Sequence, residues 1–455
     1  MREISPLDGR YRDRLAPLGE FFSEFALVQA RLEVELRYLI ALDEAETGLF
    51  KRLASDERGR MDELLDGLSE TDFERVKAIE SEIRHDVKSC EVFLRDRLDL
   101  SEPERIHFGL TSADINNLAY GLILKRFRDE VQLPQLKALV ATLADMAQET
   151  CETPFPARTH GQMASPSTAG KELAVFVDRL VRQGRQLGVF SFRGKLTGAT
   201  GTFAAFHVVD ASFDWVGFSK RFVESLGLEP HIVTTQIDDG DALAEYFDLT
   251  ARIHRIVLDL DLDCWEYLSR GELIQRAVAG EVGSSTMPHK VNPIRFENSE
   301  GNLTVANALL RAFSEKLSRS RMQRDLSDTT VRRNIGVALA HGHLAIGETL
   351  RGLDEITVNE SLCREHIDAV PAVLTEAVQT VLRVEGIENA YERLREATRG
   401  QTLSLADLHV FIDGLEIAGA VKERLKALRP FDYVGLAPEI CRCVVEEARA
   451  WLAES

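Results

Sequence analysis

Long runs of helical periodicity, separated by short loops, constrain the fold of this chain more than any other feature. Between Asp114 and about Leu353, apolar residues recur at every third or fourth position over stretches of roughly 20–30 residues. Glycine, serine and proline gather in the loops between these stretches. Several helices longer than the usual globular length indicate a bundle of nearly parallel helices. The expected helices are Asn117–Glu149, Gly170–Phe190, Asp241–Arg270, Phe296–Ser318 and Thr330–Arg351.

The chain divides into three segments that differ in helical pattern. Its 455 residues exceed an ordinary domain, so two or three domains are expected. The first hundred residues predict short amphipathic helices, one of them over Phe21–Leu42, and a polar loop follows at 101–113. Inside the first long helix of the middle segment, Pro134 is expected to cause a kink. We therefore predict an all-α chain with an N-terminal helical domain at 1–105, a central long-helix bundle at 106–353 and a C-terminal helical domain at 354–455.

Composition and charge exclude several classes of protein. A net charge of −19 argues against nucleic acid or an anionic membrane as a partner, because the average surface repels both. The six cysteines have neither zinc-ligand nor C-x-x-C spacing, so we expect reduced thiols and no metal site or other cofactor. The N-terminus has no apolar signal region, and no stretch approaches eighteen consecutive apolar residues. These features predict a cytoplasmic protein.

The most unusual stretch is GEVGSSTMPHKVNP at Gly280–Pro293. One interpretation is a helix–helix loop in which Ser284, Ser285 or Thr286 caps the next helix. Against it stands the length, since connections in helix bundles usually have about 2–8 residues and longer loops tend to be functional. The loop also offers hydroxyls, backbone N–H groups and the Lys290 ammonium together. This combination suits a carboxylate ligand or a developing carbanion.

Two further loops carry candidate functional residues. His160 lies between Thr159 and Gly161 in ARTHGQMASPSTAGK. A lone histidine is more often structural than catalytic, but this one has polar neighbours on both sides. In HFGLTSADINN, Thr111 and Ser112 precede a helix, with Asp114 placed as a capping-box partner. Free N–H groups at such a helix start also receive anions, so capping and binding can both hold.

A cluster of arginines stands out in this acidic chain. The segment SRMQRDLSDTTVRRN at Ser320–Asn334 contains Arg321, Arg324, Arg332 and Arg333. A solvated helix face is one interpretation, and a clamp for a phosphate group is the other. Smaller polar groups at Arg10–Tyr11 and Arg84–Asp86 cannot be interpreted from composition.

Together these segments resemble the fumarase/aspartase superfamily, whose signature GSSxMPxKxNP is complete at Gly283–Pro293. Further segments resemble the branch of that superfamily that acts on succinylated purine nucleotides. The resemblance covers essentially the whole chain in the same order. The matching segments are SPLDGRY at Ser5–Tyr11, RHDVK at Arg84–Lys88, RTHGQ and PST within Arg158–Thr168, TTQI at Thr234–Ile237, FENSEGNL at Phe296–Leu303 and RDLSDTTVRRN at Arg324–Asn334.

The resemblance implies a fold and a reaction. It implies a three-domain, all-helical subunit in a homotetramer, with each active site built from three subunits. The implied reaction is a β-elimination in purine biosynthesis that breaks a carbon–nitrogen bond and releases fumarate. The implied partners are small nucleotide substrates, with neither nucleic acid nor membrane.

The resemblance also implies a role for individual residues. Ser284 would be the base that removes the Cβ proton, which requires its alkoxide to be stabilised by N–H groups and nearby charge. His160 would be the acid that protonates the leaving nitrogen, and His85 is also implied in catalysis. The residues implied in substrate binding are Arg10, Tyr11, Arg84, His85, Asp86, Thr111, Ser112, Gln236, Lys290, Asn292, Asn298, Arg324, Thr329 and Arg333.

Other functions remain as alternatives. Fumarase, aspartase and argininosuccinate lyase share the signature, but His289 and the Arg324–Asn334 segment supply what a nucleotide needs and a simple dicarboxylate does not. A non-catalytic structural protein is disfavoured by the intact Ser284, His160 and Lys290. A helical scaffold for a protein partner would explain the bundle and leave the signature loop without purpose.

Overall fold

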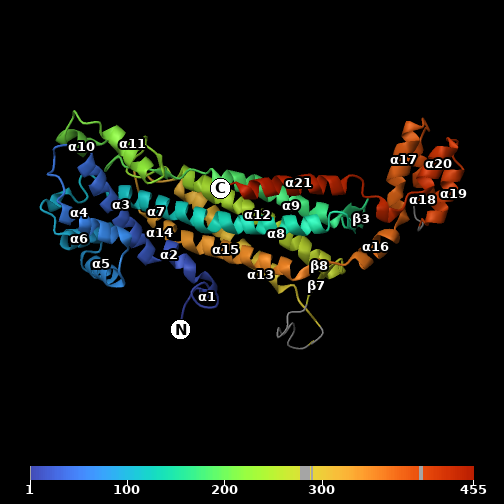
Figure 1. Cartoon of the computed structure of the whole chain (residues 1–455), viewed down its shortest axis with the longest axis horizontal. Coiled ribbons are helices and arrows are strands. Elements are labelled where there is room, and N and C mark those ends of the chain that lie inside the picture. Colours follow the sequence, from blue (N-terminus) through green and yellow to red (C-terminus); the bar gives the residue numbers. More distant parts are fainter. Residues whose placement is uncertain (1, 277–286, 288–289, 399–402, 455) are drawn as a thin grey trace. The chain divides into compact units, whose positions relative to one another are not determined.

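A computed structural model describes residues 2–276, 287, 290–398 and 403–454 of the chain. Helices make up most of these residues, and the strands are only two or three residues long, which confirms the prediction of an all-α fold (Figure 1). The α-helices are α1 (Arg12–Leu15), α2 (Gly19–Phe22), α3 (Glu24–Glu44), α4 (Ser55–Asp66), α5 (Glu70–Ile83), α6 (Asp86–Leu98), α7 (Ser112–Phe127), α8 (Leu133–Glu149), α9 (Ala169–Gly188), α10 (Ala204–Val209), α11 (Trp215–Ser225), α12 (Asp241–Arg270), α13 (Ile294–Leu317), α14 (Ser327–Arg332), α15 (Ile335–Asp354), α16 (Glu360–Asp368), α17 (Thr375–Val384), α18 (Ala390–Thr398), α19 (Leu405–Asp413), α20 (Gly419–Lys426) and α21 (Ala437–Ala453).

Short strands join the loops between these helices in pairs. Three pairs are antiparallel and the pair β5–β6 is parallel. The pairs are β1 (Pro154–Phe155) with β4 (Ser167–Thr168), β2 (Arg158–Thr159) with β3 (Gln162–Met163), β5 (Arg193–Gly194) with β6 (Glu229–Pro230), and β7 (Leu273–Gln275) with β8 (Ile356–Val358). Short 3-10 turns also occur, at Ala16–Leu18, Pro103–Arg105, Pro371–Leu374 and Pro430–Asp432.

The chain forms two compact units, each built from separate stretches of sequence. The first unit comprises 1–135, 186–255 and 301–345, and the second comprises 136–185, 256–300 and 346–455. The boundaries between the units fall within long helices such as α12. The three-domain division at residues 105 and 353 stays a prediction.

The first unit contains an apolar core drawn from the first 106 residues. Ser23 is the N-cap of α3, and its hydroxyl accepts the N–H of Ala26 at 3.1 Å. One face of α3 then packs on α4 and α6, because its apolar side chains recur at helical spacing. The ring of Phe25 in α3 also contacts that of Phe73 in α5. The buried members of this core are Val28, Leu32, Leu36, Leu39, Met61, Leu64, Val76, Cys90, Phe93, Leu94, Leu98, Leu100 and Ile106.

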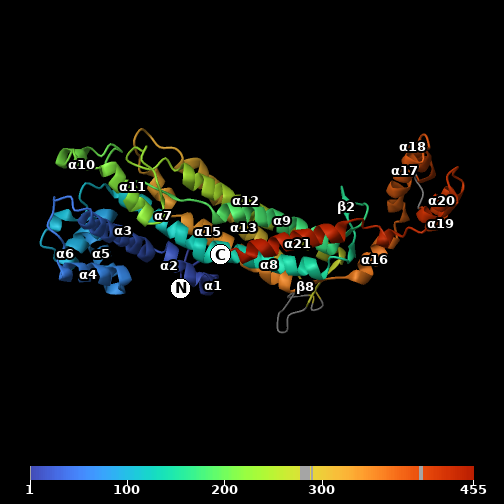
Figure 2. The ribbon, with the colours of Figure 1, turned by 45° about the horizontal axis from the view of Figure 1, so that its top comes forward.

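The second unit contains long helices and a separate cluster of short ones. The parts of α8 and α9 that belong to this unit run alongside α21 in both views of the ribbon, and Arg179 of α9 pairs with Asp259 of α12 (Figure 2). The Cys441 thiol of α21 donates to the carbonyl of Ala147 in α8 at 3.4 Å. Helices α17 to α20 bury their own apolar core, which includes Val378, Leu382 and Ile412.

The long helices lie close to their expected positions. Helix α12 has the expected bounds of Asp241–Arg270, and α9 and α13 each begin or end within two residues of expectation. The expected helix 117–149 differs, because a π-helical turn at Arg128–Gln132 separates α7 from α8. Pro134 lies in the first turn of α8, where its missing N–H is tolerated.

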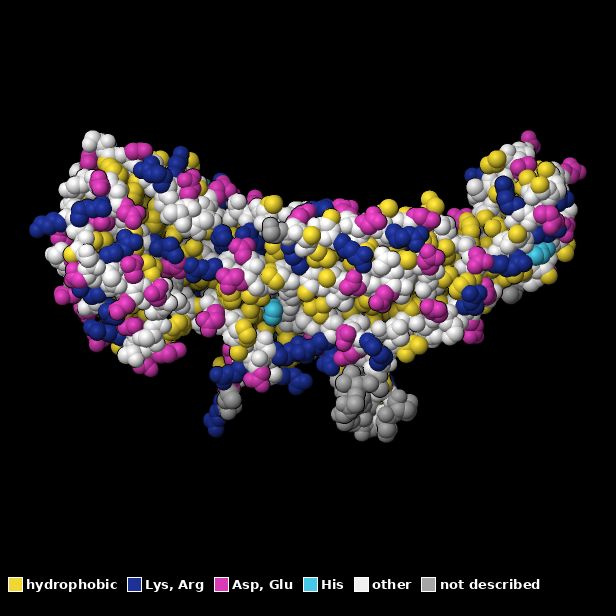
Figure 3. All heavy atoms as spheres, in the orientation of Figure 1, with side chains coloured by type: hydrophobic (Ala, Val, Ile, Leu, Met, Phe, Trp, Pro, Cys, Tyr) yellow, Lys and Arg dark blue, Asp and Glu magenta, His cyan; other side chains and the backbone are white. Residues whose placement is uncertain are grey.

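No helix among the described residues combines the length and apolar character that crossing a membrane requires. Figure 3 shows acidic and basic side chains interspersed over the visible face of the molecule.

Close packing between α9 and α21 yields a stability prediction. A Cβ atom on Gly184 would lie 2.3 Å from the Trp451 ring, so Gly184→Ala should destabilise the protein by about 1–3 kcal/mol through overpacking. Gly188→Ala is the matched control on the same helix, because its Cβ would meet only a Leu133 side-chain carbon at 3.8 Å. The control should be neutral or stabilising by up to about 1 kcal/mol. Thermal unfolding of both variants measures this, and equal melting temperatures would contradict it.

Candidate active site

The residues predicted to act on a substrate fall in both units. Those in the first unit are Arg10, Tyr11, Arg84, His85, Asp86, Thr111, Ser112, Gln236, Arg324, Thr329 and Arg333. Those in the second unit are His160, Lys290, Asn292 and Asn298. The predicted base, Ser284, and its neighbour His289 lie outside the described residues.

In the first unit, Asp86 joins two arginines that come from distant segments. Its carboxylate lies 2.6 Å from Arg31 of α3 and 3.6 Å from Arg333. Burial by itself would raise the pKa of Asp86, but the charge of Arg31 and hydrogen bonds from Arg31 and the Val87 N–H outweigh it. The pKa of Asp86 is therefore below its ordinary value, and the carboxylate stays ionised.

Four arginines line one small cleft beside this pair. Arg31, Arg324, Arg332 and Arg333 surround it together with Thr329. The acidic residues among its lining are Asp238 and Asp328, and Asp328 pairs with Arg332 at 3.5 Å. The remaining positive charge makes the cleft suitable for an anionic group such as a phosphate, for which arginine offers a planar set of donors.

His85 lies at the start of α6 with one ring nitrogen already in use. Its Nδ1 accepts the backbone N–H of Lys88 at 3.1 Å, as an N-cap residue does. A neutral imidazole that accepts through Nδ1 carries its proton on Nε2. The side chain is about half exposed, so Nε2–H can donate to a bound molecule.

Five other predicted residues of the first unit lie at the start of a helix or in a loop. Thr111 caps α7, and its N–H donates to the Asp114 carboxylate at 2.8 Å, as the capping-box interpretation predicts. Ser112 is the first residue of α7. The Gln236 amide donates to the carbonyl of Ala199 at 3.1 Å and accepts from Arg324 at 3.2 Å, so the arginine cleft and Gln236 are directly linked. Arg10 lies beside the ring of Tyr11, with 5.9 Å between the guanidinium carbon and the ring centroid.

In the second unit, His160 lies at the tip of a β-hairpin. Strands β2 and β3 pair, and the two-residue turn between them has positive φ at both His160 (53°) and Gly161 (75°). This is the geometry of a type I′ turn, which matches the twist of the strands. The turn leaves the His160 side chain exposed.

A buried carboxylate anchors the His160 hairpin. Glu272 is fully buried and forms a bidentate ion pair with Arg158 of β2, with N–O distances of 2.5 and 2.9 Å. His366 of α16 contacts the same carboxylate at 3.0 Å. Glu272 therefore links Arg158 of the hairpin to helix α16. Arg158 lies two residues before His160, so the link is close to the exposed imidazole.

The described part of the signature loop precedes α13. Lys290 is exposed, and its backbone N–H donates to the carbonyl of Met287 at 3.0 Å. Asn292 is half-buried and lies two residues before α13, and Asn298 lies in the second turn of that helix. The three side chains are thus held at or near the start of one helix.

A larger cavity in the second unit has a different character. It has a volume of about 350 Å³ and is lined mainly by apolar side chains such as Phe155, Phe176 and Tyr267. Glu172 and Asp263 are also part of its wall, and burial together with nearby carboxylates raises the pKa of Asp263 to about 6. None of the predicted site residues is among its described lining, and its acidic wall disfavours an anionic substrate.

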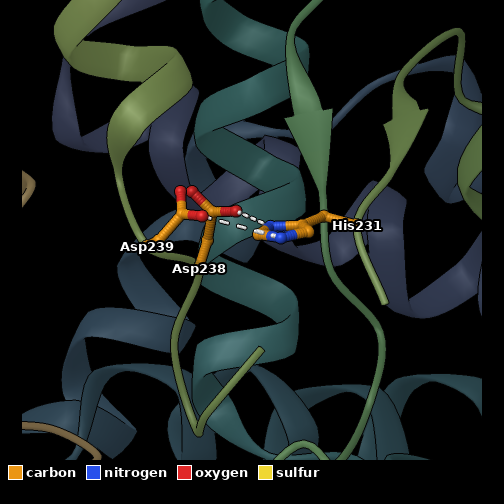
Figure 4. A group of neighbouring side chains, drawn as sticks. All are labelled: His231, Asp238 and Asp239. Carbon is orange, nitrogen blue, oxygen red and sulfur yellow. Dashed lines mark hydrogen bonds and ion pairs between the residues drawn. The ribbon is translucent and has the colours of Figure 1, made fainter. Parts of the chain in front are cut away.

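The described residues contain one group with the composition of a metal site, namely His231, Asp238 and Asp239 (Figure 4). Figure 4 shows the imidazole facing both carboxylates, with Nδ1 2.7 Å from Asp238 and Nε2 3.6 Å from Asp239. The Nδ1 contact has the length of a direct hydrogen bond, so it leaves no room for an ion between the two atoms. In this geometry His231 is ion-paired with both carboxylates.

Sequence reasoning missed several residues of this region. Arg31 is buried beside Asp86 and lies on a largely apolar face of α3. The same face also buries Glu35 one turn later, so two charged residues at core positions of the helix were the available signal. Lys195 and Glu272 are also fully buried, but nothing local distinguishes them from exposed charged residues.

Two family models match the chain. Residues 9–307 match the family described as Lyase, and residues 320–434 match the one described as Adenylosuccinate lyase C-terminal. Two solved structures have the same fold. The 3-carboxy-cis,cis-muconate lactonizing enzyme of Pseudomonas putida has a TM-score of 0.77 at 21% identity, covering 96% of this chain and 98% of that one. A fumarate lyase of Mesorhizobium sp. BNC1 has a TM-score of 0.76 at 19% identity, covering 95% and 97%.

Relatives match over nearly their full length. The adenylosuccinate lyase of Escherichia coli K12 is 44% identical over 442 residues, which cover 95% of this chain and 96% of that protein. The adenylosuccinate lyase of Haemophilus influenzae is 43% identical over 96% of this chain and 97% of that protein. The fold and the similarity to these families and relatives together identify the chain as a lyase of the fumarase/aspartase superfamily. More narrowly, the chain belongs to the adenylosuccinate lyase family.

The His231 cluster yields a prediction about pH. The hydrogen bond that the His231 Nδ1–H donates to Asp238 raises the pKa of His231 above its ordinary value, with burial acting against it and Asp239 adding to it. A raised folded-state pKa gives stability that is complete below pH ~6.5 and is lost as the pH rises through the folded pKa. His231→Gln should therefore lower Tm more at pH 6 than at pH 9, by at least about 2 °C.

Thermal melts from pH 6 to pH 9 measure this difference. His207→Gln, at an exposed position of α10, is the control and should show no such dependence on pH. A constant difference between wild type and His231→Gln across this range would contradict the prediction.

Proposed function

We propose that this chain cleaves adenylosuccinate to AMP and fumarate, and SAICAR to AICAR and fumarate. The observation that carries the proposal is the near full-length similarity, at 44% identity, to the adenylosuccinate lyase of Escherichia coli. The arginine cleft of the first unit supports it, because both substrates carry a phosphate that fumarase and aspartase substrates lack. The reaction belongs to purine nucleotide biosynthesis and needs no cofactor.

The proposed chemistry is a β-elimination. Ser284, as its alkoxide, takes the proton from Cβ of the succinyl group, and the electron pair moves into the adjacent carboxylate. Lys290 and Asn292 hold this carboxylate, so their interaction strengthens as negative charge develops on it. The Cα–N bond then breaks, and His160 gives its proton to the leaving nitrogen. The exposed position of His160 at a hairpin tip suits this role.

The remaining residues are assigned to parts of the substrate. Thr111, Ser112 and Gln236 bind the succinyl group, which the helix start and the fixed amide of Gln236 support. His85 binds on the ring and phosphate side together with Arg84 and Asp86, and also assists catalysis through Nε2. The residues proposed around the phosphate and ribose are Arg10, Tyr11, Arg324, Thr329 and Arg333, and Asn298 completes the substrate contacts next to the signature loop.

We also propose a cytoplasmic homotetramer with shared active sites. All six cysteines are free, which suits a reducing compartment. The predicted site residues are divided between two units, and a site drawn from several subunits would bring them together. Large apolar side chains on the long helices, among them Leu262 and Trp265 of α12, are 45% and 38% exposed and would be covered by other subunits.

The function is tested by offering four substrates to the purified protein in parallel. Fumarate released from adenylosuccinate, argininosuccinate, malate and aspartate is followed by its ultraviolet absorbance. Only adenylosuccinate should be cleaved efficiently, because only it presents a phosphate to the arginine cleft. Comparable turnover of malate or argininosuccinate would assign the chain to a different branch, and no turnover of any of them would reject the enzyme function.

Shared active sites are tested by mixing two inactive variants. Ser284→Ala and His160→Ala homotetramers should each lose activity, by at least the roughly 10²–10⁴-fold of a lost acid or base. Co-refolding them at equal amounts should restore about one quarter of wild-type activity, because random mixing pairs an intact Ser284 and an intact His160 in that share of sites. Ser285→Ala is the matched control and should stay active. No recovery in verified hybrid tetramers would reject the shared-site proposal.

A further inference from the structure

One ion pair of the first unit is completely withdrawn from water. The Lys195 ammonium lies 2.7 Å from the Asp114 carboxylate, and both side chains have no exposed surface. Burial is the larger effect on Lys195 and lowers its pKa, while the charge and hydrogen bond of Asp114 oppose that shift. Because desolvation of two charges can cost more than their attraction returns, such a pair is poor evidence for a gain in stability. Its hydrogen bonds indicate a different role.

Four further hydrogen bonds of this pair reach three separate segments of the chain. The ammonium donates to the carbonyls of Gln236, at 2.7 Å, and of Gly198, at 3.1 Å. The Asp114 carboxylate accepts the N–H of Thr197 at 3.0 Å and the N–H of Thr111 at 2.8 Å. The pair therefore ties the start of α7, the loop at 195–201 and the segment that carries Gln236 to one point.

The two loops also contact each other directly. The hydroxyls of Thr197 and Thr234 are 2.7 Å apart, and the Gln236 amide donates to the carbonyl of Ala199. Gly201 has a φ of +76°, and a Cβ atom there would lie 2.1 Å from the Thr234 carbonyl oxygen. The two loops therefore have little freedom to move relative to each other. The buried Lys195 ammonium donates to a carbonyl of each of them.

We propose that Lys195 is a positioning residue that holds Gln236 in register with the Thr111–Ser112 start of α7. These are the residues assigned to the succinyl group, so the inference rests on the proposed function. With no exposed surface, Lys195 cannot touch a substrate itself. It acts through the main-chain carbonyl of Gln236, and a small displacement of a group that orients a substrate can cost about 10²-fold in rate.

The test compares Lys195→Met with the double variant Lys195→Met/Asp114→Asn. The single variant leaves a buried carboxylate without its partner and should lose stability. The double variant removes that unpaired charge, and its Tm should return toward that of the wild type. In both, kcat/KM for adenylosuccinate should fall about 10²-fold, while inhibition by AMP, which has no succinyl group, should change less than about 3-fold.

The matched control is Lys125→Met, which removes a lysine paired with Asp129 at 3.0 Å on an exposed surface. It should keep the wild-type kcat/KM. If neither Lys195 variant folds, Gly201→Ala displaces the Thr234 carbonyl from the other side and leaves the ion pair intact. It should produce the same selective loss. A folded double variant with wild-type kcat/KM would overturn the proposal.

Hydrogen exchange in the protein without substrate gives a readout that does not depend on the reaction. In the double variant, amides of residues 196–201 and 232–240 should exchange faster than in the wild type, while those of α3 and α11 remain unchanged. Unchanged exchange in both segments would overturn the positioning role, even if wild-type enzyme cleaves adenylosuccinate. Absence of that activity in the wild type would overturn the proposed function alone.

Discussion

Buried ion pairs that join distant segments are the interactions on which the candidate site depends. Asp114 binds Lys195, Asp86 binds Arg31, and Glu272 binds Arg158, and each pair lies within one unit. Asp114 and Asp86 lie in the first turns of α7 and α6, whereas Glu272 lies in a loop and Arg158 lies in β2. Each pair holds a segment that carries a predicted site residue. Such pairs are costly to desolvate, so they are expected where they determine geometry rather than where they only add stability.

The long helices could be predicted because their signal is local. The pattern of α12 is continuous from Asp241 to Arg270 and has no breaker, and the structure has the same bounds. The break in the helix at 117–149 could not be placed, because it depends on a tertiary interaction. Arg128 turns its guanidinium toward the carbonyls of Leu187 and Phe190, which lie about sixty residues later, and the π-helical turn begins at this arginine.

Prediction of the candidate site was limited in the same way, because local patterns could be recognised and long-range contacts could not. The capping box of Thr111 and the clustering of arginines in 320–334 are visible in sequence, and the structure brings Arg324 and Arg333 to one cleft. The residues that hold these groups in place are not visible, because Lys195 and Glu272 are single charged residues whose partners are 81 and 114 residues away in the chain. The sequence pattern shows which functional groups a segment carries, whereas only the fold shows which buried residues hold those groups in place.

The two arginines on Asp86 differ in what they can do for an anionic ligand. Arg31 is 6% exposed and is fixed on two sides, by Asp86 at 2.6 Å and by Asn116 at 2.8 Å. Arg333 is 49% exposed and is 3.6 Å from the same carboxylate, a looser contact that water already screens. A phosphate can therefore draw Arg333 away at small cost, while Arg31 remains to neutralise Asp86. In a chain of net charge −19, this arrangement would let a carboxylate lie beside the proposed phosphate site without repelling its ligand.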